Sequence, residues 1–189
     1  MMVKAKRTGT KVTTGKVRLS YAHLFTAHSI EGNDPKFSVA ILIPKTDKLT
    51  IQCIREATAD AIKAGESKLV AKAGGKIPAN LKTPLRDGDE ERPDDEAYKG
   101  MYFLNASSKN RPGVVDANVH AIMDDTEVYS GCYGRLTINF YAFSASGNKG
   151  IAAGLGNVQK LEDGEPLGAF TRPESDFDTV ESSDNDFLG

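Results

Sequence analysis

Apolar and polar residues alternate most regularly over residues 135–143, RLTINFYAF. The apolar members fall at every second position: Leu136, Ile138, Phe140 and Ala142. Because successive side chains of a β-strand point to opposite faces, this period predicts a half-buried strand. The same signal predicts strands over 15–26, 36–44 and 98–106, and over much of 127–143.

One segment has the spacing of a helix instead. Its apolar residues recur every three or four positions: Leu49, Ile51, Ile54, Ala57, Ala61 and Ile62. Thr46 or Asp47 can cap its start, because a side-chain oxygen there accepts a bond from a free backbone N–H, and Gly65 can end it. Two strands, a helix and several more strands predict a mainly β protein with one or two helices, built as a small β-barrel with a helix against it.

Charge is distributed unevenly along the 189 residues. All 24 Lys and Arg residues precede Glu174, whereas six of the 26 Asp and Glu residues lie in 174–189. Six basic residues come before the first acid, Glu31: Lys4, Lys6, Arg7, Lys11, Lys16 and Arg18. We therefore expect a basic body, with residues 1–14 as a flexible basic arm.

Residues 174–189, ESDFDTVESSDNDFLG, combine six acids with Phe177 and Phe187. So few apolar residues cannot offset the entropy lost on ordering, and the segment is expected to be a disordered tail. A tail that carries the charge of a polyanion indicates that the basic body binds one. A purely solubilising tail is the alternative, and composition by itself leaves both open.

The sequence lacks the patterns of several other classes of site. Cys53 and Cys132 stand far apart and in no CxxC motif, and the three histidines have neither metal-ligand spacing nor an evident nucleophile partner. No cofactor is therefore expected. The chain has no apolar run of membrane-spanning length and no signal-peptide pattern, so the expected location is a reducing cytoplasm.

The polar face of the 135–143 strand is the sharpest candidate for binding chemistry. It carries a guanidinium, two hydrogen-bonding side chains and two rings: Arg135, Thr137, Asn139, Tyr141 and Phe143. Cations that hold phosphates beside rings that stack bases are typical of sequence-tolerant single-strand binding, although either ring taken singly is more typical of packing under a loop or helix. Further candidates are Tyr102 for stacking and, for phosphate contacts, Lys16, Arg18, Lys109, Arg111 and Lys149.

The acidic stretch 85–96, LRDGDEERPDDE, suggests an enzymatic alternative. Clustered carboxylates can hold Mg²⁺ for phosphodiester hydrolysis, so residues 87–96 could serve a metal-dependent nuclease. Metal nucleases usually take their ligands from separate rigid elements, whereas this run occupies one turn-rich stretch. A solvated loop is the simpler interpretation, and no metal site is expected. The glycines at 147–150 fit a hairpin turn better than a phosphate-binding loop.

Several segments together resemble a phage single-stranded DNA-binding protein family. They are LRDGDEE, SSKNRPGVVD, EVYSGCYGRLTINFYAF, GNKGIAAGLGNVQKLEDGE and the acidic terminus, and the similarity covers most of 15–168. The resemblance implies an OB-fold and non-catalytic coating of single strands in phage DNA replication, recombination or repair. It also implies a tail that recruits replication enzymes and competes with DNA for the basic groove. If a phage encodes the chain, the expected cytoplasm is that of the host bacterium.

The tail residues expected to bind a partner are Asp184, Asp186, Phe187 and Leu188. The family's pattern ends on the aromatic residue, whereas Phe187 is followed here by Leu188 and Gly189. A pocket that reads a terminal Phe carboxylate would therefore meet a different chain end in this protein.

Together these observations predict one OB-like domain over residues 1–173 and a disordered acidic tail over 174–189. The expected function is sequence-tolerant binding of single-stranded DNA without catalysis, with replication or recombination proteins as partners of the tail. Two alternatives stay open: the nuclease, and a phage structural or partner-binding module whose basic body meets an acidic protein. Binding of duplex DNA and the oligomeric state are left open by the sequence.

Overall fold

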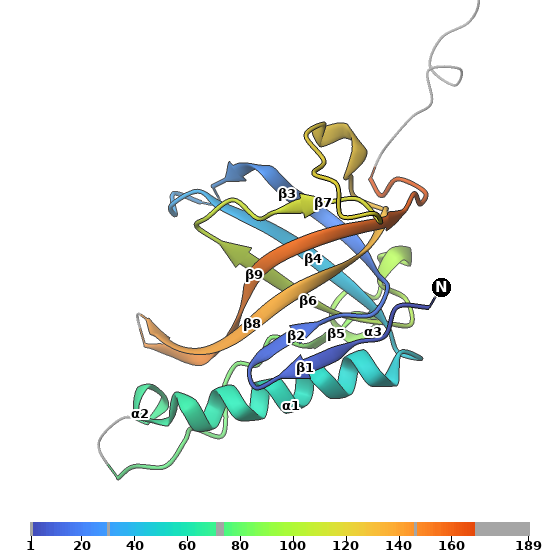
Figure 1. Ribbon diagram of the computed structural model, residues 1–189. Coiled ribbons are helices and arrows are strands. Elements are labelled where there is room, and N and C mark those ends of the chain that lie inside the picture. Colours follow the sequence, from blue (N-terminus) through green and yellow to red (C-terminus); the bar gives the residue numbers. More distant parts are fainter. Residues whose placement is uncertain (1, 30, 71–73, 146, 169–189) are drawn as a thin grey trace, which may run out of the picture.

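The computed structural model describes residues 2–29, 31–70, 74–145 and 147–168 of the chain (Figure 1). The segment 174–189, with the predicted partner contacts Asp184, Asp186, Phe187 and Leu188, lies outside the described residues. Every helix within the described ranges is too short or too polar to span a membrane.

Five strands of the described chain close into a ring. They are β3 (Val17–His28), β4 (Lys36–Pro44), β6 (Met101–Ser108), β8 (Tyr133–Ala145) and β9 (Asn148–Glu162). Hydrogen-bonded neighbours follow the order β8-β3-β4-β6-β9, and pairing of β8 with β9 closes the ring. All neighbours are antiparallel except β6 and β9. Because a five-stranded Greek-key ring is the OB arrangement, the prediction of a mainly β, OB-like fold is confirmed.

The core is made by the alternating faces that the sequence predicts. The inward residues of β8 are Leu136, Ile138, Phe140 and Ala142, and those of β4 include Val39, Ile41 and Ile43. Each fully buried Leu, Ile or Phe stabilises the fold by about 1.5–3 kcal/mol relative to an exposed side chain. A one-residue slip of register would turn these side chains to solvent, so the hydrophobic pattern fixes which face of each strand points outward.

A smaller apolar cluster covers part of the outer face of β4 and β6. Leu42 lies opposite Phe103 on the neighbouring strand, and the rings of Phe103 and Tyr98 meet edge-on with centroids 5.0 Å apart. Tyr98 lies two residues beyond the acidic stretch. The stretch folds as β5 (Arg86–Asp87) and α3 (Gly88–Glu91), and its last residue begins the 3₁₀ helix η1 (Glu96–Tyr98). The stretch expected to be a solvated loop is therefore packed against the barrel through its apolar end.

Helix α1 (Lys48–Ala64) confirms the predicted helix, and the short α2 (Glu66–Leu69) follows it. The Asp47 side chain caps α1 by accepting a bond from the Thr50 N–H at 3.1 Å. Gly65 ends it where a Cβ would clash with the Cβ of Ala142 on β8, so only glycine fits this approach of helix to strand. Leu49, expected on the apolar face, is 44% exposed, whereas Thr50 and Ile51 of the same turn are buried.

The predicted basic arm is folded over residues 6–13. Strands β1 (Lys6–Thr8) and β2 (Lys11–Thr13) form a hairpin, and β2 pairs with β8 along the barrel (Figure 1). Gly9 supplies the positive φ of the turn, and Val12 is fully buried. Arg7 ties the hairpin to α1 through Glu56 at 3.1 Å and Asp60 at 2.5 Å. Charge counting missed this hairpin because its apolar signal is a single valine. The remaining described elements are β7 (Val114–Val115) and the 3₁₀ helix η2 (Asp125–Glu127).

Candidate nucleic-acid interface

The outer face of β3, β4 and β6 carries a groove of about 850 Å³, which we call the main groove. Its floor follows from register: Ser38 pairs with Ser107 and Ala40 with Asn105, while their strand neighbours point into the core. These four side chains are small, so the floor is hollow. The turn between β3 and β4 supplies Asn33 and Asp34 at one rim, and the acidic stretch supplies Arg86 and Arg92 at the other.

The main groove is cationic and aromatic. Its cations are Lys36, Arg86, Arg92 and Lys109, against Asp34 as the one carboxylate among its lining residues. Its rings are Tyr21, His23, His28, Tyr98 and Phe103. A positive groove with aromatic platforms has the properties that single-stranded nucleic acid needs, since the phosphates are charged and every base has a π-face.

Arginines of the acidic stretch lie against the aromatic rings of the barrel. The Arg86 guanidinium lies 5.2 Å from the Phe103 ring centroid, and that of Arg92 lies 4.7 Å from Tyr98 and 5.8 Å from Tyr21. Within about 6 Å such pairs attract through the ring quadrupole. The stretch therefore fixes two guanidinium groups at the groove, and each also pairs with an acid of the same stretch, Arg86 with Glu91 and Arg92 with Asp95.

Tyr21 stands at an irregularity of β3. Its φ is +46°, rare for a residue with a side chain, and the register between β3 and β4 shifts between Ser20 and His23. The side chain is 58% exposed. Strained backbone at an exposed aromatic residue is more typical of a functional position than of a packing one. The bulge turns this ring out to the groove.

His23 and His28 stack in the groove with ring centroids 4.4 Å apart and planes 10° from parallel. Partial burial, and then the neighbouring His28, lower the pKa of His23 below its ordinary value. Near neutral pH the His23 ring is therefore neutral. An anionic ligand would oppose that shift and favour the charged form.

The predicted phosphate contacts are spread over the barrel. Lys109 lines the main groove, and Arg111 lies 5.6 Å from the centroid of Phe25 on β3. Lys16 pairs with Glu162 at 2.9 Å, across from the groove. Lys149 stands beside the β8–β9 turn, opposite Ser144.

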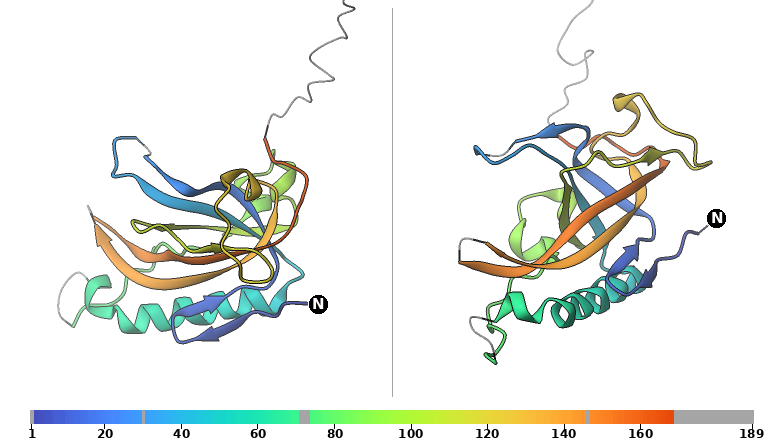
Figure 2. Two further views of the ribbon diagram at one scale, coloured as in Figure 1. Left: turned by 45° about the horizontal axis from the view of Figure 1, so that its top comes forward. Right: turned by 60° about the vertical axis from the view of Figure 1, so that its left-hand side comes forward.

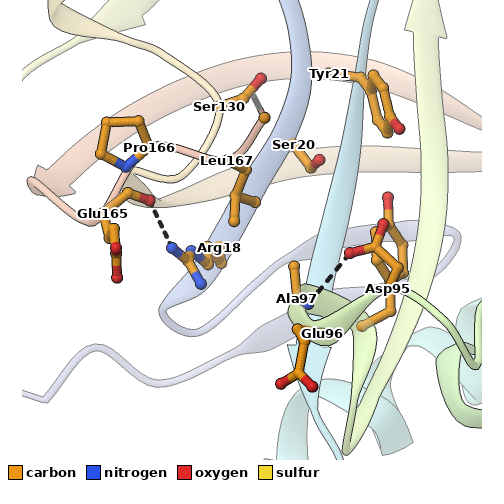
Figure 3. Close-up of a pocket in the computed structure, with 12 residues that line it drawn as sticks. Arg18, Ser20, Tyr21, Asp95, Glu96, Ala97, Ser130, Glu165, Pro166 and Leu167 are labelled. Atoms are coloured by element: carbon orange, nitrogen blue, oxygen red, sulfur yellow. Dashed lines mark hydrogen bonds between the residues drawn. The ribbon is translucent and has the colours of Figure 1, made fainter. Parts of the chain in front are cut away.

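Arg18 lines a separate cavity of about 490 Å³ next to the main groove (Figure 3). It donates to the backbone oxygens of Gly131 at 3.1 Å and Glu165 at 2.6 Å. Leu167 closes the cavity, its N–H donating to Ser130 O at 2.8 Å. Tyr21 and Tyr98 line both this cavity and the main groove, so the two hollows adjoin.

The predicted stacking rings also separate. Tyr141 is 45% exposed on the outer face of β8, where Arg135 lines another groove, away from β4 and β6. Phe143 is half-buried near the β8–β9 turn, paired with Gly150. Tyr102 is half-buried with Lys45 Nζ 5.1 Å from its ring centroid. Its neighbour Phe103 points to the opposite face of β6, as adjacent strand residues must.

The acidic residues of 87–96 are largely engaged by cations. Lys45 Nζ lies 2.7 Å from Asp87 and 2.8 Å from Asp89, and Arg86 pairs with Glu91. Hydrogen bonds from Lys45 hold the pKa of both aspartates below their ordinary range. In the described part of the chain, no three Asp, Glu, His or Cys side chains gather as a metal site.

The sequence matches the family described as "Enterobacter phage Enc34, ssDNA-binding protein" over residues 10–188. The chain belongs to this family. A relative, putative protein p50 of Acyrthosiphon pisum secondary endosymbiont phage 1, is 32% identical over an alignment of 185 residues that covers 94% of this chain and 98% of the relative.

Solved structures of phage proteins share the family's fold. The single-stranded DNA-binding protein of bacteriophage Enc34 in complex with ssDNA has a TM-score of 0.69 and 27% identity, over 88% of this chain and 98% of that one. The bacteriophage T7 protein gp2.5, also a single-stranded DNA-binding protein, has a TM-score of 0.55 over 86% of this chain and 97% of that one. At 14% identity, gp2.5 supports the fold alone.

The residues that sequence reasoning did not select are those whose role depends on folding. Tyr21 and Phe103 sit in strands with ordinary patterns, and Arg86 and Arg92 lie within an acidic run. For Arg86, Arg92 and Phe103 the one available signal is the excess of rings and cations within 86–103, and Tyr21 lies outside that range. These residues come together only when the outer faces of β3, β4 and β6 are folded side by side, so the sequence could not show that they share one groove.

Proposed function

We propose that this protein binds single-stranded DNA in the main groove, without sequence specificity and without catalysis, in phage DNA replication, recombination or repair. The observation that carries the proposal is the position of the groove. It lies on the outer face of β4 and β6, which are the second and third of the five barrel strands in chain order. OB-folds bind oligonucleotides on the face of these two strands. Membership of the Enc34 family supports the same ligand.

Within the groove, cations contact phosphates and rings stack on bases. Lys36 and Lys109 stand at one end, where they are exposed, and Arg86 and Arg92 at the other. Tyr21, 58% exposed, offers a free ring face between them. The rings of Phe103 and Tyr98 are buried and support the guanidinium groups of Arg86 and Arg92 that lie against them. Since such contacts are made to phosphates and π-faces, affinity is sequence-tolerant and falls as salt rises.

Several contacts predicted from the sequence extend this path. The β3–β4 and β8–β9 turns project from the same side of the barrel (Figure 2), and OB-folds bind with both of these loops. Lys149 and Phe143 at the second turn are therefore placed to contact DNA leaving the groove, as is Arg111 beside Phe25. Lys16, Arg18 and Tyr102 already have protein partners, so they contribute less.

Removing the exposed cations of the groove tests the proposal. The double variant Lys36→Gln/Lys109→Gln should weaken binding to labelled oligo-dT about tenfold at low salt. It should also make the slope of log affinity against log salt concentration shallower by about 1.4, since each lost phosphate contact removes about 0.7 from that slope. Its control is Lys48→Gln/Lys63→Gln, which removes two exposed cations of α1. Equal affinities of the two double variants by fluorescence anisotropy would refute the main groove.

Absence of catalysis is supported by the engagement of Asp87 and Asp89 with Lys45. Labelled single-stranded DNA incubated with the protein and Mg²⁺ should remain intact on a denaturing gel. Cleavage that Asp87→Asn/Asp89→Asn abolishes would instead establish the nuclease alternative. If the protein shifts no DNA on a native gel even at low salt, the partner-binding module is the remaining alternative.

The segment 174–189 is proposed to compete with DNA and to recruit replication or recombination proteins. The described chain ends at Gly168, in the cavity that shares Tyr21 and Tyr98 with the main groove, and the first of the six acids, Glu174, follows six residues later in the sequence. A chain ending at Pro173 should bind oligo-dT more tightly; unchanged affinity would rule out competition. The contacts proposed for a partner are Asp184, Asp186, Phe187 and Leu188.

A further inference from the structure

A second cationic surface lies on the outer face of β8 and its neighbours β2 and β9, and it shares no lining residue with the main groove. We define the β2–β8 face as the outward side chains of the hairpin β1–β2, of β8 and of the end of β9. Its members are Lys6, Thr8, Lys11, Thr13, Arg135, Thr137, Asn139, Tyr141, Asn157 and Gln159. We propose that this face binds a second segment of the same single strand that occupies the main groove. The inference rests on the proposed function and extends it.

Strand register brings this face together from residues far apart in sequence. Lys11 pairs with Asn139, Thr13 with Lys6 on one side and Thr137 on the other, and Arg135 with Gln159. The members from Lys6 to Thr137 and from Asn157 to Gln159 line a groove of about 460 Å³. The surface is therefore one hollow across four strands, with hydroxyls and amides between its cations.

The charge of this groove is uncompensated. Lys6, Lys11 and Arg135 line it, and none of its lining residues is acidic. Among the described residues, Lys6 and Lys11 make no ion pair, whereas Arg7, on the opposite face of the same hairpin, meets Glu56 and Asp60. The hairpin thus has one face neutralised by α1 and one face left positive, which matches an external polyanion.

The Arg135 guanidinium is held loosely. Its one hydrogen bond within the described chain runs from Nη2 to Lys4 O at 3.4 Å, and its Nε is buried without a partner. Buried donors are almost always satisfied, so the guanidinium of Arg135 is only partly bonded within the described chain. A phosphate at the groove would give the guanidinium the charge-assisted bonds it lacks.

The floor of the face is flattened by two glycines of β9. A Cβ at Gly156 would lie 2.9 Å from Thr137 O, and one at Gly154 would touch the Tyr141 ring at 3.4 Å. Tyr141 therefore lies along the sheet beyond the groove, half of its surface open to solvent. This gives the β2–β8 face a stacking ring next to its phosphate-binding cations, the combination that single strands require.

The two grooves are linked by the loop after β6. Lys109, at the start of this loop, lines the main groove, and Gly113, at its end, donates to Asn157 Oδ1 at 3.2 Å, on the rim of the second groove. Arg111 lies between these two residues in the sequence, with its guanidinium 5.6 Å from the Phe25 ring centroid. The loop thus contacts both grooves and carries two cations, which gives a strand leaving the main groove over Lys109 a route toward Lys11 and Arg135.

We assign DNA as the occupant because one continuous strand can then fill the main groove and the β2–β8 face together. An acidic peptide, including the chain's own residues 174–189, would also be attracted by charge but has few rings to stack on Tyr141. The two occupants differ in one measurable way. A second segment of DNA requires a long strand, whereas a peptide site is independent of strand length.

The test compares short and long strands. Labelled oligo-dT of about 8 nucleotides fits within one OB-type site, whereas about 30 nucleotides exceed it. In the full chain, Lys6→Gln/Lys11→Gln should weaken binding of the long strand about tenfold and make the slope of its log affinity against log salt concentration shallower by about 1.4. Binding of the short strand should be unaffected. The control Lys48→Gln/Lys63→Gln should change neither strand.

Two results with the full chain would overturn the proposal. One is that the Lys6→Gln/Lys11→Gln variant binds the long strand as tightly as the control does, and the other is that it loses affinity equally for both strands. If the variant's effect disappears in a chain ending at Pro173, the face binds the acidic segment and not DNA. Arg135→Gln gives a second, independent variant with the same expected split between strands, provided that its melting temperature shows a folded protein. Failure of the main groove would appear differently, as short-strand affinity unaffected by Lys36→Gln/Lys109→Gln.

Discussion

Arg92 lies over Tyr21, its guanidinium 5.8 Å from the ring centroid and its Nη2 3.1 Å from the tyrosine oxygen. The two residues are 71 positions apart, one in the acidic stretch and one at the bulge of β3. The contact holds an exposed, strained tyrosine beside a cation at the end of the main groove. It is the clearest case here of chemistry assembled by the fold.

Replacing Tyr21 should cost DNA affinity. Stacking of a base on an aromatic side chain contributes about 1–3 kcal/mol, so Tyr21→Ala should weaken oligo-dT binding roughly 5- to 150-fold. Tyr21→Phe keeps the ring and loses only the bond to Arg92, so it should bind within a few-fold of the natural protein. Fluorescence anisotropy measures both. If both variants lose affinity equally, the hydroxyl and not the ring makes the contact.

Affinity for DNA should rise as pH falls through the titration of His23. The pKa of His23 is lowered in the free protein by burial and by His28, and nearby phosphates would raise it. Binding therefore takes up protons below about pH 6.5, and each unit by which DNA raises this pKa is worth about tenfold in affinity. Anisotropy titrations of the natural protein and His23→Gln between about pH 8 and 5.5 check this. Parallel pH profiles would exclude His23.

The same group should destabilise the free protein in acid. The pKa of His23 is lower in the folded chain than its ordinary value of 6.5, so the unfolded chain binds the proton more readily. Its contribution to the free energy of unfolding is thus complete above about pH 6.5 and is lost as pH falls through the folded pKa. Thermal melts of His23→Gln should show a shallower decline over that range than the natural protein.

Lys45 should stabilise the fold near neutral pH through Asp87 and Asp89. Its bonds hold the pKa of both aspartates below the ordinary value of 3.8, so the stabilisation is present above that value and is lost as pH falls through the folded pKa values. Lys45→Met should lower the melting temperature at pH 7, and the difference from the natural protein should close in acid. A difference that persists at pH 2 would mean that the contact of Lys45 with the Tyr102 ring, and not its ion pairs, is lost.

Gly65 should resist substitution. A Cβ there would clash with that of Ala142, so Gly65→Ala should destabilise the protein by about 1–3 kcal/mol, the usual cost of overpacking, despite the better helix propensity of alanine. Ala142→Gly in the same chain should recover part of this loss. Urea unfolding of the four proteins of this cycle gives the coupling. Additive effects would show that the helix end can move away from β8.

The sequence predicted those parts of the fold that depend on local pattern. The inward face of β8 followed from period two, and the cap at Asp47 and the end at Gly65 followed from the chemistry of helix termini. The hairpin of residues 6–13 did not follow, because its cations outnumber its one buried valine. Local pattern had no information about pairing with β8, which lies more than 120 residues away.

The candidate contacts divide in the same way. Their residue types, cations beside rings, were predictable because phosphates and bases require them. Their grouping was not: Lys109 entered the main groove, Arg135 and Tyr141 the β2–β8 face, and Arg18 a third hollow closed by Leu167.

By itself the sequence determined a basic barrel domain, an acidic end and the family, since charge, alternation and motif order are properties of the chain. Only the tertiary structure decided which cations share a groove and which are neutralised. Arg7 and Lys6 are adjacent in sequence, yet one faces the acids of α1 and the other faces solvent. The physical reason is that strand register and helix packing select the neighbours of each charge, and those neighbours lie far away along the chain.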